Sequence, residues 1–264
     1  MKRKLWLCCL VFGTLAACSK KDKDNAPSAA AKYLTQMTQE TGGITTAYTL
    51  SYDDKKRLTA YVEKEEGVLT TERALTYDAS GRLVKLKNDH PQEGTYEEYT
   101  FTYNAAGVPE KYVRKISDDD GLKTTINGTY TIANGKVTRI TEKDTDPENP
   151  IEIYMDFTYA GNNVTKVAVS SDEAPTVVSS IELTHGGKKN PLRAGLQLNY
   201  ALLSDLALEA LSENETLTME LRIGNNVQLQ STTTYQYDAQ GYPTSSEEHE
   251  NGSNEVTKTT YQYK

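Results

Sequence analysis

One short motif recurs along most of this chain of 264 residues and limits what the chain can fold into. Its clearest copy is Leu75–Leu83, in which Tyr77 is followed by Asp78, two small residues, Gly81 and Arg82. Related segments are Tyr48–Leu58, Tyr99–Val108, Tyr130–Val137, Phe157–Val164, Tyr235–Tyr242 and Tyr261–Tyr263. Tyr52, Tyr77 and Tyr103 follow one another at intervals of 25 and 26 residues. A steady period of this length indicates an array of repeated supersecondary units.

Each unit has the pattern of a β-hairpin. Large and polar residues alternate with period two, which places the aromatic rings on one face of a strand. Asp or Asn, small residues and Gly then supply a turn. A unit of this length holds two strands, and short turns make neighbouring strands antiparallel. The sequence therefore predicts an all-β, antiparallel meander of about 15 strands, curved into a barrel or half-barrel.

Tyrosine far outnumbers phenylalanine. The chain has 18 Tyr, and Phe101 and Phe157 are its phenylalanines after residue 17. A deep, dry core favours Phe, because each buried phenol needs a hydrogen-bond partner. Tyr suits places where the ring packs and the hydroxyl reaches water. The tyrosine content therefore favours a thinly covered sheet face or a barrel with a wet interior.

Two segments depart from the hairpin pattern. Residues 199–211 are rich in Leu and Ala, with Leu202, Leu203, Leu206 and Ala210 at helical spacing, and predict an inserted α-helix after a loop at 186–191. The segment 29–40 fits either a short helix or additional tether.

The N-terminus has the features of an export signal. Lys2, Arg3 and Lys4 precede a short apolar run that ends in small residues before Cys18. This order resembles the bacterial lipoprotein signal, which implies lipidation of Cys18 and cleavage before it. The predicted organisation is a signal peptide at 1–17, a lipidated tether at 18–32 and a single β-meander domain at 33–264. A lipidated Cys18 leaves no other cysteine after the leader for disulfide, thiol or zinc chemistry.

Charge and polarity exclude several classes of protein. The net charge is −8, and cleavage of the leader would remove three positive charges and make the chain more acidic. An acidic chain lacks the basic face that nucleic-acid binding requires. The mean hydropathy of −0.64 argues against a polytopic helical membrane protein. A membrane-spanning barrel needs an apolar outer band, whereas the alternate positions here are Thr, Glu and Lys.

The motif at Tyr77–Leu83, partly matched at Tyr237–Gly241, resembles the YD repeats of Rhs-type bacterial proteins. The Cys18 signal, the repeated hairpins and the helix predicted at 199–211 together resemble a family of Bacteroidota lipoproteins of unknown function. That resemblance implies a porin-like, curved antiparallel meander. It implies no activity and no functional residues.

The sequence contains no pattern that predicts a catalytic, cofactor-binding or metal site. His90, His185 and His249 stand beside turn residues and are interpreted as surface histidines. Asp118–Asp120 and the set Asp144, Asp146 and Glu148 lack the spacing of an EF-hand calcium loop.

The sequence therefore favours a non-catalytic lipoprotein, held in the cell envelope by its anchor and assigned to the outer membrane, with the periplasmic or surface face left open. It would act as a binding or scaffold module for a glycan or a protein partner. The alternative is a carrier of an apolar or lipid ligand in which the segment 199–211 acts as a lid over an apolar cavity. An enzyme is the least favoured class.

Overall fold

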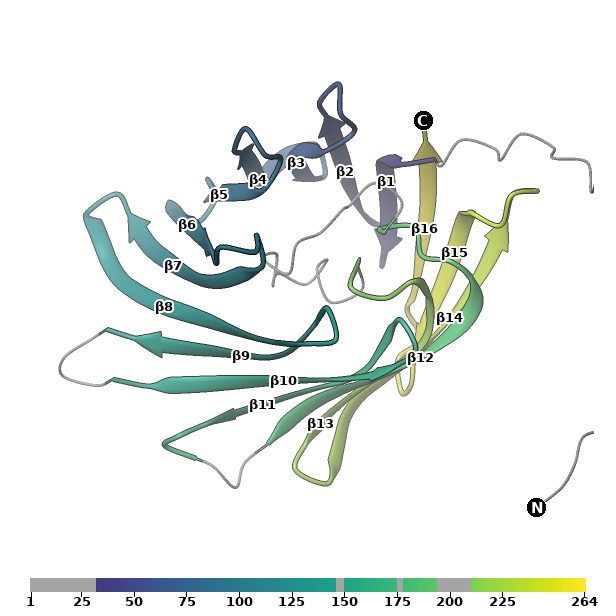
Figure 1. Ribbon diagram of the computed structural model, residues 1–264. Coiled ribbons are helices and arrows are strands. Elements are labelled where there is room, and N and C mark those ends of the chain that lie inside the picture. The colour runs from purple at the N-terminus through teal and green to yellow at the C-terminus, as the bar shows by residue number, and fades with distance from the viewer. Residues whose placement is uncertain (1–31, 146–149, 175–177, 194–209) are drawn as a thin grey trace, which may run out of the picture. The chain divides into compact units, whose positions relative to one another are not determined.

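The repeated motif forms a chain of β-hairpins in the computed structural model, which describes residues 32–145, 150–174, 178–193 and 210–264. Sixteen strands follow one another through these residues (Figure 1). They are β1 Leu34–Thr41, β2 Ile44–Tyr52, β3 Leu58–Glu65, β4 Val68–Tyr77, β5 Leu83–His90, β6 Thr95–Tyr103, β7 Pro109–Asp118, β8 Gly121–Ala133, β9 Lys136–Asp144, β10 Glu152–Ala160, β11 Asn163–Ser171, β12 Ser179–Lys189, β13 Asn214–Ile223, β14 Asn226–Tyr237, β15 Pro243–Glu250 and β16 Val256–Tyr263.

Each strand pairs antiparallel with the strand before it, and β1 closes the ring by pairing with β16. Figure 1 shows the sheet curling round until the first and last strands lie side by side. The predicted antiparallel meander is confirmed. Its closed form settles the choice between barrel and half-barrel, and the described residues contain sixteen strands rather than about fifteen.

The first strand lies where the sequence predicts a short helix or additional tether. Leu34–Thr41 form β1, and all of these residues except Thr41 fall in the segment 29–40. This strand carries no copy of the Tyr-Asp motif, and it is fixed by its register against β16 from Leu34↔Tyr263 to Glu40↔Lys258. Because the partner lies at the far end of the sequence, no local pattern indicates the pairing.

Around residue 190, the sequence predicts a loop followed by a helix. The loop predicted at 186–191 is partly wrong, because β12 continues through Gly186 to Lys189 and pairs there with β13. The predicted helix at 199–211 falls almost entirely outside the described residues, since 194–209 are not described.

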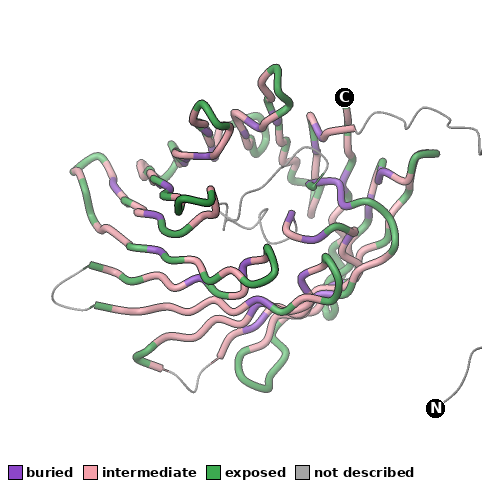
Figure 2. Tube along the Cα trace, in the orientation of Figure 1, coloured by how far each residue is buried: buried purple, intermediate pink, exposed green. Residues whose placement is uncertain are grey.

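Alternation along each strand separates an inner face from an outer face. In β2, Tyr48, Leu50 and Tyr52 point toward the buried cluster, while Thr49 and Ser51 are exposed. Figure 2 shows the same pattern around the barrel, with buried points scattered along strands that are otherwise intermediate or exposed. A barrel of sixteen strands is too wide for its inward side chains to fill completely. A continuous dry core is therefore not expected.

The Asp or Asn of the motif organises the turn that follows its strand. Asp78 Oδ1 accepts a hydrogen bond from the Arg82 amide at 2.9 Å, and its Oδ2 lies 2.7 Å from Arg82 Nε. Asp53 binds Arg57 in the same way. The backbone hydrogen bonds to Asp78, together with Arg82, hold the pKa of this carboxyl below its usual value. Gly81 supplies the positive φ of the turn (84°), and Lys56 adopts that conformation in the turn that lacks a glycine (61°).

The motif tyrosines fasten the strand ends at the same end of the barrel, which we call the Asp-turn end. Each hydroxyl donates to a backbone carbonyl on the preceding strand, at 2.7–2.9 Å, in the pairs Tyr52 to Leu34, Tyr77 to Leu58, Tyr103 to Leu83 and Tyr159 to Val137. A basic side chain covers several of these rings, as Arg57 covers Tyr77 at 4.5 Å. Burial raises the pKa of Tyr77 to about 12, so its hydroxyl remains a donor at neutral pH.

We expect the substitution Tyr77→Phe to lower the free energy of unfolding by about 1 kcal/mol, because the Leu58 carbonyl loses its donor while the ring is retained. Tyr96→Phe is the matched control, since Tyr96 lies 41% exposed on the outer face. Denaturant unfolding of both variants measures the difference. Equal losses in the two variants would show that the hydroxyl bond does not stabilise the strand ends.

Candidate functional site in the barrel lumen

The lumen of the barrel has two unlike walls. Along β5–β11, large inward side chains pack on one another, among them Tyr99, Phe101, Tyr112 and Phe157. Along β1–β4 and β13–β16, the inward side chains leave a cavity of about 310 Å³. The cavity is the candidate functional site.

Tyr112 shows how the packed wall is built. Its ring lies directly over Gly128 on the neighbouring strand, where a Cβ atom would come within 2.1 Å of ring carbons. Its hydroxyl donates to Glu142 at 2.5 Å. Because Gly128 has no side chain, it leaves space for the Tyr112 ring. Glycine in a strand often marks such a place of close approach.

A charged network lies beside this ring. Arg114 contacts Glu97 at 2.5 Å and Glu142 at 4.0 Å. Asn88 and Tyr99 each donate to Glu97 at 3.2 Å. Burial alone would raise the pKa of Glu97, but Arg114 outweighs it and holds the pKa below its usual value. The network therefore stays charged, and within it Arg114 Nε and Asn88 Oδ1 are buried without a hydrogen-bond partner.

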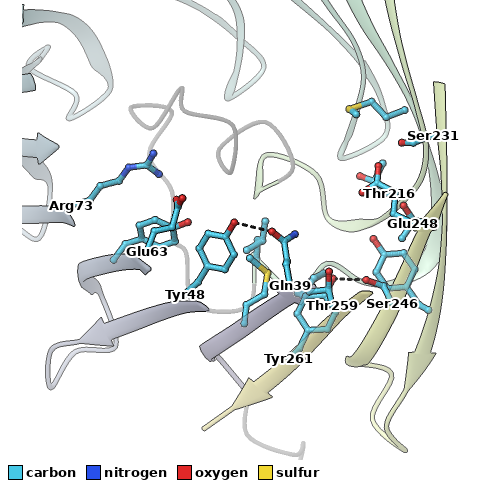
Figure 3. A pocket seen from close by; sticks show the side chains of 17 residues that line it. Gln39, Tyr48, Glu63, Arg73, Thr216, Ser231, Ser246, Glu248, Thr259 and Tyr261 are labelled. Atoms are coloured by element: carbon cyan, nitrogen blue, oxygen red, sulfur yellow. Dashed lines mark hydrogen bonds between the residues drawn. The ribbon is translucent and has the colours of Figure 1, made fainter. Parts of the chain in front are cut away.

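The cavity wall combines aromatic rings with hydrogen-bonding groups (Figure 3). Tyr48 and Tyr61 form a tilted pair with ring centroids 5.8 Å apart. The Tyr48 hydroxyl donates to Gln39 Oε1 at 2.8 Å. The remaining lining residues are Met37, Glu63, Arg73, Pro191, Leu192, Thr216, Met219, Ser231, Thr233, Tyr235, Ser246, Glu248, Thr259 and Tyr261.

Three charged side chains enter the cavity from two sides. Figure 3 shows Glu63 and Arg73 on one side and Glu248 on the other. Arg73 lies over the Tyr61 ring, with its guanidinium carbon 4.9 Å from the ring centroid. Hydroxyl-bearing residues also line the cavity, with Thr216 and Ser231 on the side of Glu248. Rings, hydroxyls and isolated charges suit a polar ligand better than a hydrocarbon chain.

The histidines lie apart from this cavity. His249 is exposed on β15, and His90 lies 3.4 Å from Thr71 Oγ1 at the end of β5. His185 is partly buried within β12, so its interpretation as a surface turn residue is wrong. Its Nε2 lies 2.7 Å from the Val164 carbonyl oxygen, which only accepts hydrogen bonds. Nε2 therefore carries a proton and is no base toward Ser212, 3.4 Å away.

The two acidic segments considered for calcium have different outcomes. Lys123 occupies the first, with Nζ 3.0 Å from Asp118 and 3.6 Å from Asp120. In the second, Asp144 accepts a hydrogen bond from Thr124, while residues 146–149 are not described. Among the described residues, no cluster of three or more His, Cys, Asp and Glu side chains has the arrangement of a metal site.

Comparison with solved structures identifies the fold. A porin-like protein from Bacteroides uniformis ATCC 8492 superposes with a TM-score of 0.54 at 18% identity, covering 88% of this chain and 96% of that one. A porin-like protein from Bacteroides vulgatus ATCC 8482 gives 0.53 at 12% identity, covering 88% and 99%. The chain therefore shares the porin-like fold, as the sequence resemblance implied.

Comparison by sequence gives no further assignment. No protein-family model matches the chain, and no curated protein matches it. In the described part of the chain, no helix is long and apolar enough to span a bilayer.

We expect Gly128→Ala to destabilise the barrel by about 1–3 kcal/mol, because the new Cβ overlaps the Tyr112 ring. Gly187→Ala is the control, since nothing lies within 4 Å of its added Cβ. Thermal unfolding of the two variants tests this, and combining Gly128→Ala with Tyr112→Leu should restore part of the loss. A stable Gly128→Ala protein would contradict the close packing described for this wall.

Proposed function

We propose that this chain is a lipid-anchored, non-catalytic binding protein of the cell envelope whose barrel lumen holds a glycan. The observation that carries the proposal is the cavity of about 310 Å³ lined by tyrosine rings, hydroxyls and carboxylates. Sugars present apolar ring faces and many hydroxyl groups, so they match a wall that offers both aromatic stacking and hydrogen bonds.

The outer face of the barrel supports a protein that is attached to a membrane rather than embedded in it. Ion pairs cross this face between neighbouring strands, as in Lys85–Glu98, Arg139–Asp156 and Lys166–Glu182. A barrel inside a bilayer presents an apolar band at these positions. The proposed attachment is instead the lipidated Cys18, with the outer membrane as its site.

The tether would join the barrel at the Asp-turn end. Tyr33 and Lys264 exchange backbone hydrogen bonds of 3.0 and 3.1 Å at the start of β1, and Lys32 pairs with Asp238 at 2.6 Å. These contacts hold the first residue after the tether in place. A force applied through the anchor would therefore act on β1, which is hydrogen-bonded to a strand on each side.

The lipid-carrier alternative fits the cavity less well. It expects an apolar wall, whereas Gln39, Glu63, Arg73 and Glu248 line this one. A hydrocarbon chain would strip water from these groups and return no hydrogen bonds, which is costly. The scaffold alternative makes no use of the cavity.

The anchor is tested by mass spectrometry of the N-terminal peptide of the membrane-bound protein. We expect the chain to begin at an acylated Cys18. Cys18→Ser should leave the protein unacylated and release it from the membrane fraction, while Cys9→Ser in the leader should change nothing. An unmodified Cys18 on a chain that keeps residues 1–17 would refute the anchoring.

Ligand class is tested by presenting residues 19–264 to a glycan array and a lipid-vesicle panel in parallel. We expect retention of glycans and not of lipids. Thr233→Trp, which fills the cavity, should abolish retention, and Thr234→Trp, one residue away on the outer face, should not. Lipid binding alone, or glycan binding unaffected by Thr233→Trp, would refute a glycan site in the lumen.

A further inference from the structure

Two arginines on the inner face of the barrel each lie opposite a tyrosine on the neighbouring strand. Arg73 on β4 lies opposite Tyr61 on β3, and Arg114 on β7 lies opposite Tyr99 on β6. In each pair the guanidinium covers the tyrosine ring, at 4.9 Å for Arg73 and 5.6 Å for Arg114. The two arginines therefore share an aromatic cross-strand neighbour.

Their carboxylate contacts differ. Arg114 is held by Glu97 and Glu142 on the packed wall. Arg73 forms no ion pair with any described residue, although the Nε atoms of both arginines are buried without a hydrogen-bond acceptor. Its cross-strand neighbours, Tyr61 and Asn88, are neutral. A carboxylate bound in the cavity would give Arg73 the ionic partner that Glu97 and Glu142 give Arg114.

The guanidinium also indicates the shape of that acceptor. It offers donors in a planar fork, which matches the two oxygens of a carboxylate. The guanidinium lies over the Tyr61 ring, and Arg73 lines the open cavity rather than the packed wall. A carboxylate in the lumen would therefore meet a donor that already packs on an aromatic ring.

The other charges of the cavity limit how many acidic groups the ligand carries. Glu63 and Glu248 line the same space, so one cation stands among two carboxylates. A polyanion would be repelled, whereas hydroxyl groups donate readily to carboxylates. The cavity therefore suits one acidic group on an otherwise neutral, hydroxylated ligand.

We propose that Arg73 anchors the carboxylate of an acidic sugar, and that the ligand of the lumen is a glycan carrying an isolated uronic or sialic acid residue. This inference rests on the proposed function, because it names the ligand class of the same cavity. It assigns Arg73 to the carboxylate and Glu63 and Glu248 to neighbouring hydroxyl groups.

The test compares glycans that differ by one acidic residue. The probes are xylotriose with and without a glucuronic acid branch, and lactose with and without a sialic acid, titrated calorimetrically into residues 19–264. We expect the acidic member of at least one pair to bind about tenfold more tightly or better. Arg73→Gln should remove that preference, while Arg73→Lys, which keeps the charge but not the fork, should retain part of it.

Arg139→Gln is the matched control, because Arg139 pairs with Asp156 on the outer face and should not affect binding. Circular dichroism of each variant establishes that it is folded. Neutral members that bind as well as acidic ones, or a preference that survives in folded Arg73→Gln, would overturn the role of Arg73 and leave the glycan site standing. Failure of both members of both pairs, with no glycan retained on the array, would overturn the glycan site as well.

Discussion

The pairing of β1 with β16 is the interaction on which the rest of the structure depends. A meander of hairpins has two free edges, and an open edge exposes a row of unpaired backbone groups. Here the register from Leu34↔Tyr263 to Glu40↔Lys258 joins the edges, and Tyr33 and Lys264 extend the ladder by two further bonds. Closure with sixteen strands fixes a circumference too large for side chains to fill, so a polar lumen follows from the backbone topology.

A wide ring also explains why tyrosine dominates. Short apolar side chains would not reach across such an interior, and phenylalanine would leave the strand-end carbonyls without donors. The Tyr52, Tyr77 and Tyr103 side chains serve both needs, because each ring packs inward and each hydroxyl binds a carbonyl of the preceding strand. These tyrosines thus add hydrogen bonds at the strand ends to the packing of the buried cluster.

The sequence predicts the parts of this fold that are encoded locally. Alternation in segments such as Tyr99–Tyr103 and the turn residues Asp78 and Gly81 indicate strands, turns and an inward tyrosine face, and the structure confirms them. The sequence does not reveal β1, because that strand is defined by a partner more than 200 residues away. The sequence does not reveal the cavity either. Whether Arg73 or Arg114 meets a carboxylate depends on side chains from other strands, and both stand in ordinary alternating patterns in the sequence.

The two inward arginines link the architecture to the proposed site. Each lies opposite a tyrosine on the neighbouring strand, and Glu97 and Glu142 pair with Arg114. With carboxylates in place, the guanidinium is a structural element that binds strands together. Where no described carboxylate pairs with it, as at Arg73, an arginine over a tyrosine ring presents a cation to the lumen. The inner face of a barrel can therefore acquire a binding site without a new sequence motif, where an inward arginine has no carboxylate paired with it.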